Sequence, residues 1–236
     1  MKVSVALENP DTLRCQIAEL EDRFQDQTLA MATSLVGLID LRDQYTGGHS
    51  LRVASYVRQI AVQMGLSSRE IENIEFAASL HDIGKIAVPD HVLLKPGALT
   101  DDEFEWIRNH PEFGWMTVRN VDEFQEAALL ILHHHERLDG NGYPGRLRGT
   151  EIPLGSRIIS VADAYDALTT TRPYRGARTH DEALGQLLLC RDTQFDSQVV
   201  HAFCASLEQG TRDQAPRPLA CTNPARATIT VFAGGT

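Results

Sequence analysis

The strongest constraint on the fold is a helix-start pattern that occurs three times, in which a serine or threonine is followed three residues later by a glutamate. The three segments are SSRE at 67–70, TDDE at 100–103 and THDE at 179–182. In this capping-box pattern the two side chains satisfy backbone N–H groups that a helix N-terminus leaves without partners. Strand-like alternation is nearly absent, apart from TITVF at 228–232. We therefore predict an all-α fold, with a helical domain over residues 35–208.

The N-terminal segment, residues 1–34, is predicted to be a helix with the spacing of a coiled-coil seam. Alternating steps of four and three connect Leu13, Ile17, Leu20, Phe24, Gln27, Met31, Ser34 and Leu38. One interpretation is an amphipathic helix that packs on its own domain, and the other is a coiled coil that joins two copies of the chain. Both stay open here, and we predict a homodimer through this helix. The segment 209–236, rich in Pro, Thr, Arg and Ala, is predicted to be a flexible tail.

The composition narrows the class of partner. A formal net charge of −10 argues against binding to a nucleic-acid polymer through a phosphate-neutralising surface. Residues 137–178 nevertheless hold seven arginines and four acids, which favours an anionic ligand there. The longest apolar run, at 127–132, is far shorter than the roughly 20 residues that span a bilayer. This short run predicts no membrane partner. The four cysteines lie far apart, so we predict a cytoplasmic protein with reduced thiols.

Histidines and aspartates occur on the inward faces of several predicted helices. His49, His81, His110 and Asp163 each share a face with apolar residues, where an unpaired polar side chain would be costly. Asp166 follows Asp163 by one helical turn. Imidazole and carboxylate ligands together suit Fe, Mn, Zn or similar ions. Four helices that each aim such a residue inward therefore predict a metal centre.

The segment ILHHHERLDGNGYP, residues 131–144, adds three consecutive histidines followed by a glycine-rich turn. This combination indicates a metal site whose ligands need a fixed backbone. Two further residues are predicted to end the helices that carry the ligands. We expect Gly84 to stop the helix that contains His81, and Pro111 to end the helix that contains His110.

Taken together, these motifs resemble the HD-GYP family, a subgroup of the HD-domain metal-dependent phosphohydrolases. The resemblance covers about residues 35–208. Its segments are DQYTGGHSLRV (43–53), HDIGKIAVPD (81–90), LLKPGALTDDEF (93–104), NHPEFG (109–114), HHERLDGNGYPG (134–145), IPLGSRIISVADAYDALTTTRPYR (152–175) and QFDSQVV (194–200). It implies a helical bundle around a centre of two or three metals, often iron or manganese, and hydrolysis of cyclic di-GMP to pGpG and sometimes on to GMP. It also implies an upstream sensor or receiver partner.

Matching the motifs residue by residue gives the site that the resemblance implies. The implied metal ligands are His49, His81, Asp82, His110, His134, His135 and Asp163. Asp82 would bridge two ions, and Lys85 would contact the scissile phosphate. Arg172 and Arg175 would contact phosphate or guanine, although the family usually carries lysine where this chain has Arg175. Tyr143, in the GYP turn that flanks the pocket, would also contact the substrate.

The resemblance also bears on the number of metals. Family members with three ions place a glutamate one turn before the first ligand histidine, where this chain has Tyr45, a poor ligand. Asp43 lies two residues further back, off the one-turn spacing. We therefore predict two divalent ions, iron or manganese. The histidines that match no ligand position are expected to have neighbouring, surface or packing roles; they are His91, His133, His180 and His201.

Two other functions stay open at this stage. The first is a receptor that binds a cyclic dinucleotide without hydrolysing it, against which the complete set of ligand-type residues argues. The second is a phosphohydrolase for another cyclic dinucleotide, such as cyclic GMP-AMP, or for a nucleotide. No motif for a serine or cysteine nucleophile is evident, so the sequence predicts metal-assisted attack by water on phosphorus.

Overall fold

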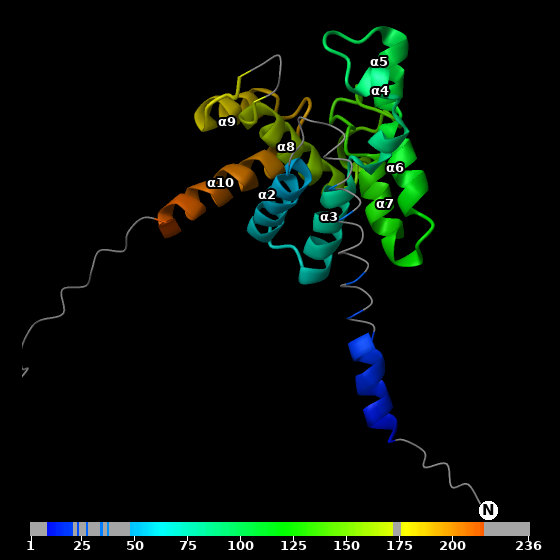
Figure 1. Ribbon diagram of the computed structural model, residues 1–236. Helices are drawn as coiled ribbons and strands as arrows, with labels where there is room; N and C mark the ends of the chain where they lie inside the picture. Colours follow the sequence, from blue (N-terminus) through cyan, green and yellow to red (C-terminus); the bar gives the residue numbers. More distant parts are fainter. Residues whose placement is uncertain are drawn as a thin grey trace, which may run out of the picture.

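The computed structural model describes residues 9–20, 23, 27, 34, 37, 48–171 and 176–214. This part of the chain is built from helices, which confirms the predicted all-α fold (Figure 1). In chain order its elements are α2 (His49–Gln63), α3 (Ser68–Leu80), η1 (Ile83–Ala87), α4 (Asp90–Leu93), α5 (Asp101–Arg108), α6 (His110–Val118), η2 (Asp122–Phe124), α7 (Gln125–Leu132), η3 (Gly149–Glu151), α8 (Leu154–Thr169), α9 (His180–Leu189) and α10 (Ser197–Gln214). Within the described ranges, strand-like pairing is limited to the isolated bridge between Arg191 and Phe195.

All three predicted capping boxes form, and each of them opens a helix. Ser67, Thr100 and Thr179 each accept a hydrogen bond from the backbone N–H of the glutamate three residues later. Each glutamate carboxylate in turn accepts a hydrogen bond from the N–H of the capping residue. A cap of this kind contributes about 1 kcal/mol to helix stability. Short local patterns therefore set the starts of α3, α5 and α9.

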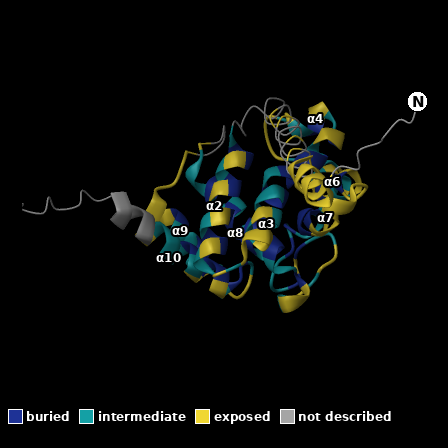
Figure 2. Ribbon diagram, turned by 90° about the horizontal axis from the view of Figure 1, so that it is seen from below, coloured by how far each residue is buried: buried dark blue, intermediate teal, exposed yellow. Residues whose placement is uncertain are grey.

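The core lies where α2 packs against α3, α8 and α10 (Figure 1). Val53, Val57 and Ile60 follow helical spacing on α2 and are fully buried, as is Phe203 of α10. Burial of one such side chain stabilises the fold by about 1.5–3 kcal/mol. Figure 2 shows the same division along each helix, with buried residues facing the neighbouring helices and exposed residues facing outward. This packing holds the start of α2 against the C-terminal half of α8, where Asp163 and Asp166 lie.

Gly84 has a role different from the predicted helix stop. The preceding helix α3 already ends at Leu80, and Gly84 lies inside η1, which packs on α6. A Cβ atom at Gly84 would lie 2.6 Å from the backbone nitrogen of Gly114 and 2.8 Å from the carbonyl carbon of His110. The prediction was wrong because the position is set by the close approach of two backbones, which the local sequence does not reveal.

Pro111 also differs from its prediction. The helix before it, α5, ends at Arg108, and Pro111 stands in the first turn of α6. At that position the missing N–H of proline costs no hydrogen bond, and its fixed φ suits the helix. Pro111 therefore starts a helix instead of ending one, and His110 is the first residue of α6.

The N-terminal seam is only partly described. Residues 10–20 are helical, and Figure 1 shows them standing clear of the bundle. Leu13, Ile17 and Leu20 are 48%, 47% and 62% exposed, so this part of the seam does not pack on the chain's own domain. Phe24, Met31 and Leu38 of the seam lie outside the described residues. The homodimer remains a prediction.

At the other end, α10 continues to Gln214, past the boundary that was predicted at residue 208. Residues 215–236, which include the TITVF segment, lie outside the described part of the chain. Among the described helices, none is both long and apolar enough to cross a membrane.

Candidate metal centre

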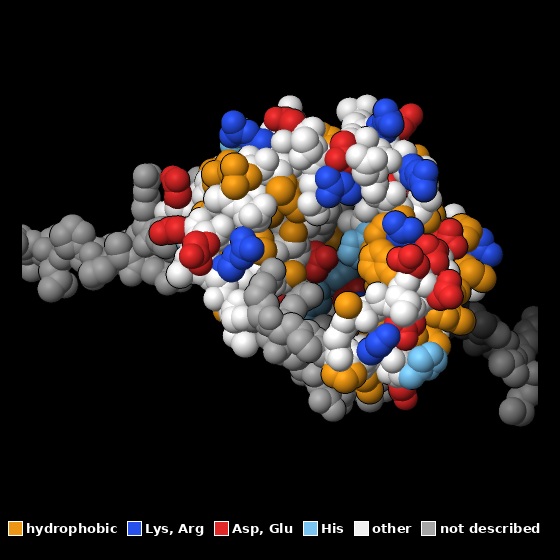
Figure 3. Space-filling view, turned by 90° about the horizontal axis from the view of Figure 1, so that it is seen from above, with side chains coloured by type: hydrophobic (Ala, Val, Ile, Leu, Met, Phe, Trp, Pro, Cys, Tyr) orange, Lys and Arg blue, Asp and Glu red, His pale blue; other side chains and the backbone are white. Residues whose placement is uncertain are grey.

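Three groups of side chains with metal-ligating atoms meet inside the bundle. The first group contains His49 of α2, His81 at the end of α3 and Asp163 of α8, and the second contains His110, His134 and His135. The third group, His81, Asp82 and His134, shares a histidine with each of the other two. Within each group the ligand atoms lie within 4.8 Å of one another. Figure 3 shows histidine and acidic side chains at the floor of a hollow on the upper face of the molecule. The structure thus brings together residues that are far apart in the sequence.

The Asp82 carboxylate lies between the first and second groups. Its Oδ2 atom is 3.4 Å from Nε2 of His81 and 3.8 Å from Nε2 of His49. Its Oδ1 atom is 3.4 Å from Nε2 of His110, on the other side. One oxygen therefore faces each group, which is the arrangement that a carboxylate needs to bridge two ions.

Three of the histidines are oriented by the ends of helices. Nδ1 of His81 donates to the carbonyl of Ala78 at 2.7 Å. Nδ1 of His110 donates to Ile107 and Nδ1 of His134 to Ile131, both at 2.6 Å. In each case the acceptor lies three residues earlier, in the last turn of the preceding helix, where carbonyls lack intrahelical partners. The ring is thereby held with its Nε2 lone pair directed into the centre.

The neutral nitrogens of the second group face one another without a proton between them. Nε2 of His110 lies 3.3 Å from Nε2 of His134, and both Nδ1 atoms already donate elsewhere. Two lone pairs at this distance repel each other, and a cation between them removes the repulsion. The residues present therefore fit a metal ion at this position.

The ionisation of these groups follows from burial and from the charges around them. Burial lowers the pKa of His110 to about 3 and that of His135 to about 4, so both imidazoles are neutral. Burial would also lower the pKa of His49, but its contacts with Asp163 and Asp166 raise it to about 10. Burial would raise the pKa of Asp163, but the contact with His49 holds it below its usual range. The centre therefore offers ionised carboxylates and the neutral imidazoles of His110, His134 and His135, whereas the raised pKa of His49 keeps a proton on that ring.

A family model described as HD domain matches residues 33–199. This chain belongs to the HD-domain family. The cyclic di-GMP phosphodiesterase response regulator RpfG of Xanthomonas campestris is 42% identical over 209 residues, covering 86% of this chain and 54% of that protein. The 3'3'-cGAMP-specific phosphodiesterase 3 of Vibrio cholerae is 40% identical over 188 residues, covering 80% of this chain and 40% of that protein.

The solved structures agree on the fold of the HD domain. The crystal structure of a cyclic GMP-AMP-specific phosphodiesterase from V. cholerae superposes with a TM-score of 0.60 at 20% identity, over 76% of this chain and 49% of that one. An HDG"Y"P protein from Bdellovibrio bacteriovorus superposes with a TM-score of 0.55 at 21% identity, over 68% of this chain and 51% of that one. The resemblance to the HD-GYP subgroup is confirmed. The chain spans about half the length of the curated relatives it matches.

Two of the predicted substrate contacts lie beside the centre of this HD domain. Nζ of Lys85 donates to Oδ2 of Asp82 at 2.7 Å. The Tyr143 ring packs on His135 with 5.0 Å between ring centroids, and it borders a hollow of about 390 Å³ between the GYP turn and α5–α6. The Cζ atom of Arg108 lies 5.8 Å from the centroid of the same ring. The other two predicted contacts, at 172 and 175, fall outside the described residues.

Sequence reasoning missed the role of Glu136 in the HD domain. This carboxylate is buried and accepts hydrogen bonds from the backbone N–H groups of Gly145 at 2.6 Å and Leu147 at 3.1 Å. A Cβ atom at Gly142 would lie 2.5 Å from the Cα atom of Glu136, so the turn folds directly onto this residue. His133, 3.6 Å from the same carboxylate, belongs to neither ligand group. Glu136 thus ties the GYP turn to the segment that carries the ligands.

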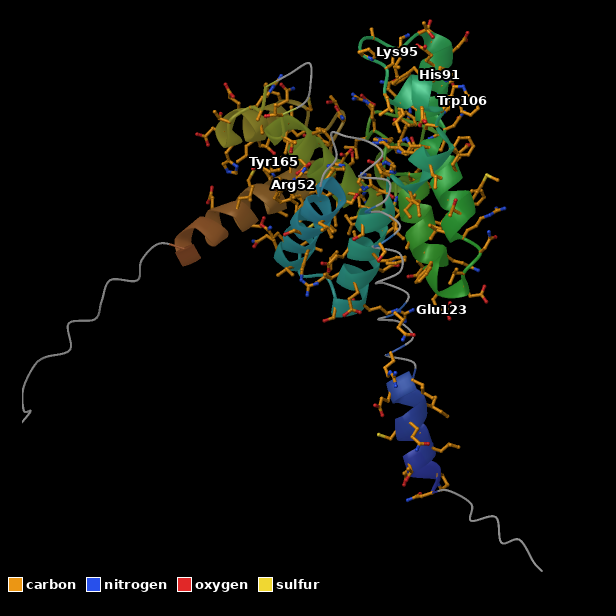
Figure 4. All side chains as sticks on the ribbon, in the orientation of Figure 1. Arg52, His91, Lys95, Trp106, Glu123 and Tyr165 are labelled. Carbon is orange, nitrogen blue, oxygen red and sulfur yellow. The ribbon has the colours of Figure 1, made fainter. Side chains whose placement is uncertain are left out.

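The remaining histidines lie away from the ligand groups. His91, His180 and His201 are all exposed, and Figure 4 shows His91 on α4 at the outer end of the molecule, near Lys95 and Trp106. Sequence reasoning also noted Asp166 without giving it a partner. In the structure it contacts His49, 117 residues away in the chain. Such a pair follows from the packing of α2 on α8, which no local pattern reveals.

Proposed function

We propose that this chain is a metal-dependent phosphodiesterase that hydrolyses a cyclic dinucleotide, with cyclic di-GMP opened to pGpG as the expected reaction. The observation that carries the proposal is the Asp82 carboxylate, with one oxygen directed to each of two ligand groups. Two divalent ions, iron or manganese, would supply Lewis-acid charge and ionise water near neutral pH. Paired ions of this kind stabilise both the attacking and the leaving oxygen in displacement at phosphorus.

Each side chain then has a distinct task. The ligands would be the members of the first and second groups together with Asp82, which lies between them. They are His49, His81, Asp82, His110, His134, His135 and Asp163. Lys85, whose ammonium contacts Asp82, would stabilise negative charge on a phosphate oxygen at the same centre. Tyr143 would position the substrate beside His135. Arg172 and Arg175 would contact its phosphates or bases.

The choice of substrate rests on the relatives. Four of the curated relatives carry cyclic di-GMP in their names without qualification, and another is named a probable enzyme of that kind. Three from V. cholerae are named as 3'3'-cGAMP-specific, which makes cyclic GMP-AMP the second candidate. We also propose a sensor or receiver partner, because the chain matches only about half of the length of a relative that is named a response regulator. We also propose that residues 35–208 form the catalytic domain.

A side-by-side assay tests the function. Purified protein loaded with Mn²⁺ or Fe²⁺ is incubated with cyclic di-GMP and with 3'3'-cGAMP, and the products are separated by chromatography. We expect pGpG from cyclic di-GMP, and loss of activity when a chelator removes the metal. Asp82→Ala should lose both metal and turnover, because the two ligand groups lose the carboxylate between them.

Each outcome of this assay is informative. Preference for 3'3'-cGAMP would replace the substrate and keep the reaction. Tight binding of either dinucleotide without hydrolysis, in protein that holds its metals, would favour a receptor instead. Full metal occupancy and full turnover in the Asp82→Ala variant would overturn the assignment of this carboxylate.

A further inference from the structure

Behind His49 stands a buried carboxylate that the proposed chemistry does not use. Asp166 of α8 is 2% exposed, and its Oδ2 atom accepts a hydrogen bond from Nδ1 of His49 at 2.7 Å. Arg52 of α2 holds the same carboxylate with two donors, Nε at 2.6 Å from Oδ1 and Nη2 at 2.9 Å from Oδ2. Figure 4 shows Arg52 projecting where α2 meets α8. The Asp166 carboxylate is therefore held in position by hydrogen bonds from two side chains of α2.

This arrangement differs from that of the other oriented histidines. The Nδ1 atoms of His81, His110 and His134 donate to backbone carbonyls, which carry no net charge. His49 donates to a carboxylate, and a carboxylate behind an imidazole makes it a more basic and better-oriented metal ligand. Of the four, His49 alone has this support.

The two ligand groups also differ in their own charge. The first group contains the Asp163 carboxylate, whereas the second consists of three imidazoles. Asp82 contributes one oxygen to each side, and its Oδ2 atom, on the side of the first group, also accepts a hydrogen bond from Lys85. Asp163 and Asp166 lie three residues apart on α8. This one helix therefore supplies both the ligand Asp163 and the carboxylate that orients the ligand His49. The first group therefore offers a divalent cation a carboxylate ligand of its own, which the second group lacks.

We propose that Asp166, held by Arg52, is a positioning residue that makes the group of His49, His81 and Asp163 the tighter of two metal positions. The two ions then bind in sequence, the first at this group and the second at His110, His134 and His135. This inference rests on the metal centre of the proposed function, but it concerns metal binding alone and needs no substrate.

Metal titration tests the proposal. Metal-free protein is titrated with Mn²⁺ by equilibrium dialysis, with bound manganese counted by elemental analysis. We expect the wild type to bind two ions in two steps of unequal affinity. Asp166→Ala should weaken the tighter step by about 10- to 100-fold, the usual range for a lost carboxylate behind a ligand histidine, and leave the weaker step unchanged. Asp166→Asn, whose amide oxygen still accepts from His49, should have a smaller effect.

A second buried ion pair, which joins α8 to the segment before α10, provides the control. Arg157 of α8 pairs with Asp196, which is also buried but contacts no member of either ligand group. Asp196→Asn should lower the unfolding temperature and leave both manganese steps unchanged. If Asp166→Ala does not fold, Arg52→Gln serves instead, because it keeps the carboxylate and loses only its support. It should weaken the tighter step alone.

The outcomes separate this inference from the proposed function. Equal weakening of both steps, an unchanged tighter step, or the same loss in Asp196→Asn would overturn the role of Asp166. Two unequal manganese steps in a protein that hydrolyses no cyclic dinucleotide would leave this inference standing and overturn the proposed function. Wild-type hydrolysis together with unchanged manganese binding in the variants would do the reverse.

Discussion

Replacing Gly84 by alanine should disturb the metal centre through the backbone. Gly84 lies in η1 directly against the start of α6, and His110 is the first residue of that helix. The added Cβ atom would lie 2.6 Å from the nitrogen of Gly114 and 2.8 Å from the carbonyl carbon of His110. Both neighbours are backbone atoms, so no side-chain rotation can make room. The helix α6 itself has to move.

The size of the effect follows from these distances. Non-bonded heavy atoms prefer separations of about 3.5 Å or more, and the carbonyl oxygen of His110 lies even closer to the added Cβ atom, so α6 must shift by at least about 1 Å. Overpacking of this kind costs typically 1–3 kcal/mol, and we expect a loss of about 3 kcal/mol in the free energy of unfolding. A 1 Å misplacement of a catalytic group costs about 10²-fold in rate. His110 moves with α6, so turnover and metal content should both fall.

Gly185 in α9 provides the control. No atom lies within 4 Å of a Cβ built there, so Gly185→Ala should be neutral or stabilising by about 0.5–1 kcal/mol. Urea unfolding of the metal-free proteins gives the stabilities, and elemental analysis gives the metal content. A Gly84→Ala variant as stable as wild type, with full metal content, would refute the argument from backbone contact.

Three further predictions concern single features of the molecule. Lys85→Ala should keep its metal and lose about 10²-fold in turnover, typical for one lost charge contact to the transition state; a full rate would show that Lys85 has no such role. Deleting residues 1–30 should shift the mass measured by light scattering from dimer to monomer and preserve the metal site, whereas an unchanged mass would exclude the seam as the interface. Metal binding at pH 8 should release close to one proton, because a pKa of about 10 keeps His49 protonated in the metal-free protein. The apparent affinity should then rise about tenfold per pH unit up to about pH 10, and calorimetry that finds no proton release would contradict this.

The parts of the fold that the sequence predicts correctly depend on short segments. Each capping box needs only four consecutive residues, and α3, α5 and α9 begin where those residues predict. The inward placement of His49, His81 and His110 likewise follows from helical spacing, and all three are buried. Their joint placement on inward faces predicts a metal centre, and the resemblance to a known family supplies the complete set of ligands.

The parts that sequence reasoning missed depend on contacts between distant segments. Asp166 meets His49 across 117 residues, and Gly84 is required by a backbone that follows 26 residues later. Pro111 was assigned to the wrong end of a helix because α5 and α6 are separated by a single residue, Asn109. In each case the local pattern allowed more than one outcome, and packing selected among them.

The positions of the ligand histidines suggest why the helix ends matter as much as the ligands themselves. His81 and His134 each follow a helix's last turn, and His110 follows the end of α5, so that Nδ1 reaches a carbonyl three residues back. A helix that ran on by one more turn would bond that carbonyl internally and release the ring. The residue at which each helix ends therefore also determines the orientation of the ligand imidazole that follows it. Changes that extend α3, α5 or α7 should weaken metal binding even though every ligand remains in the chain.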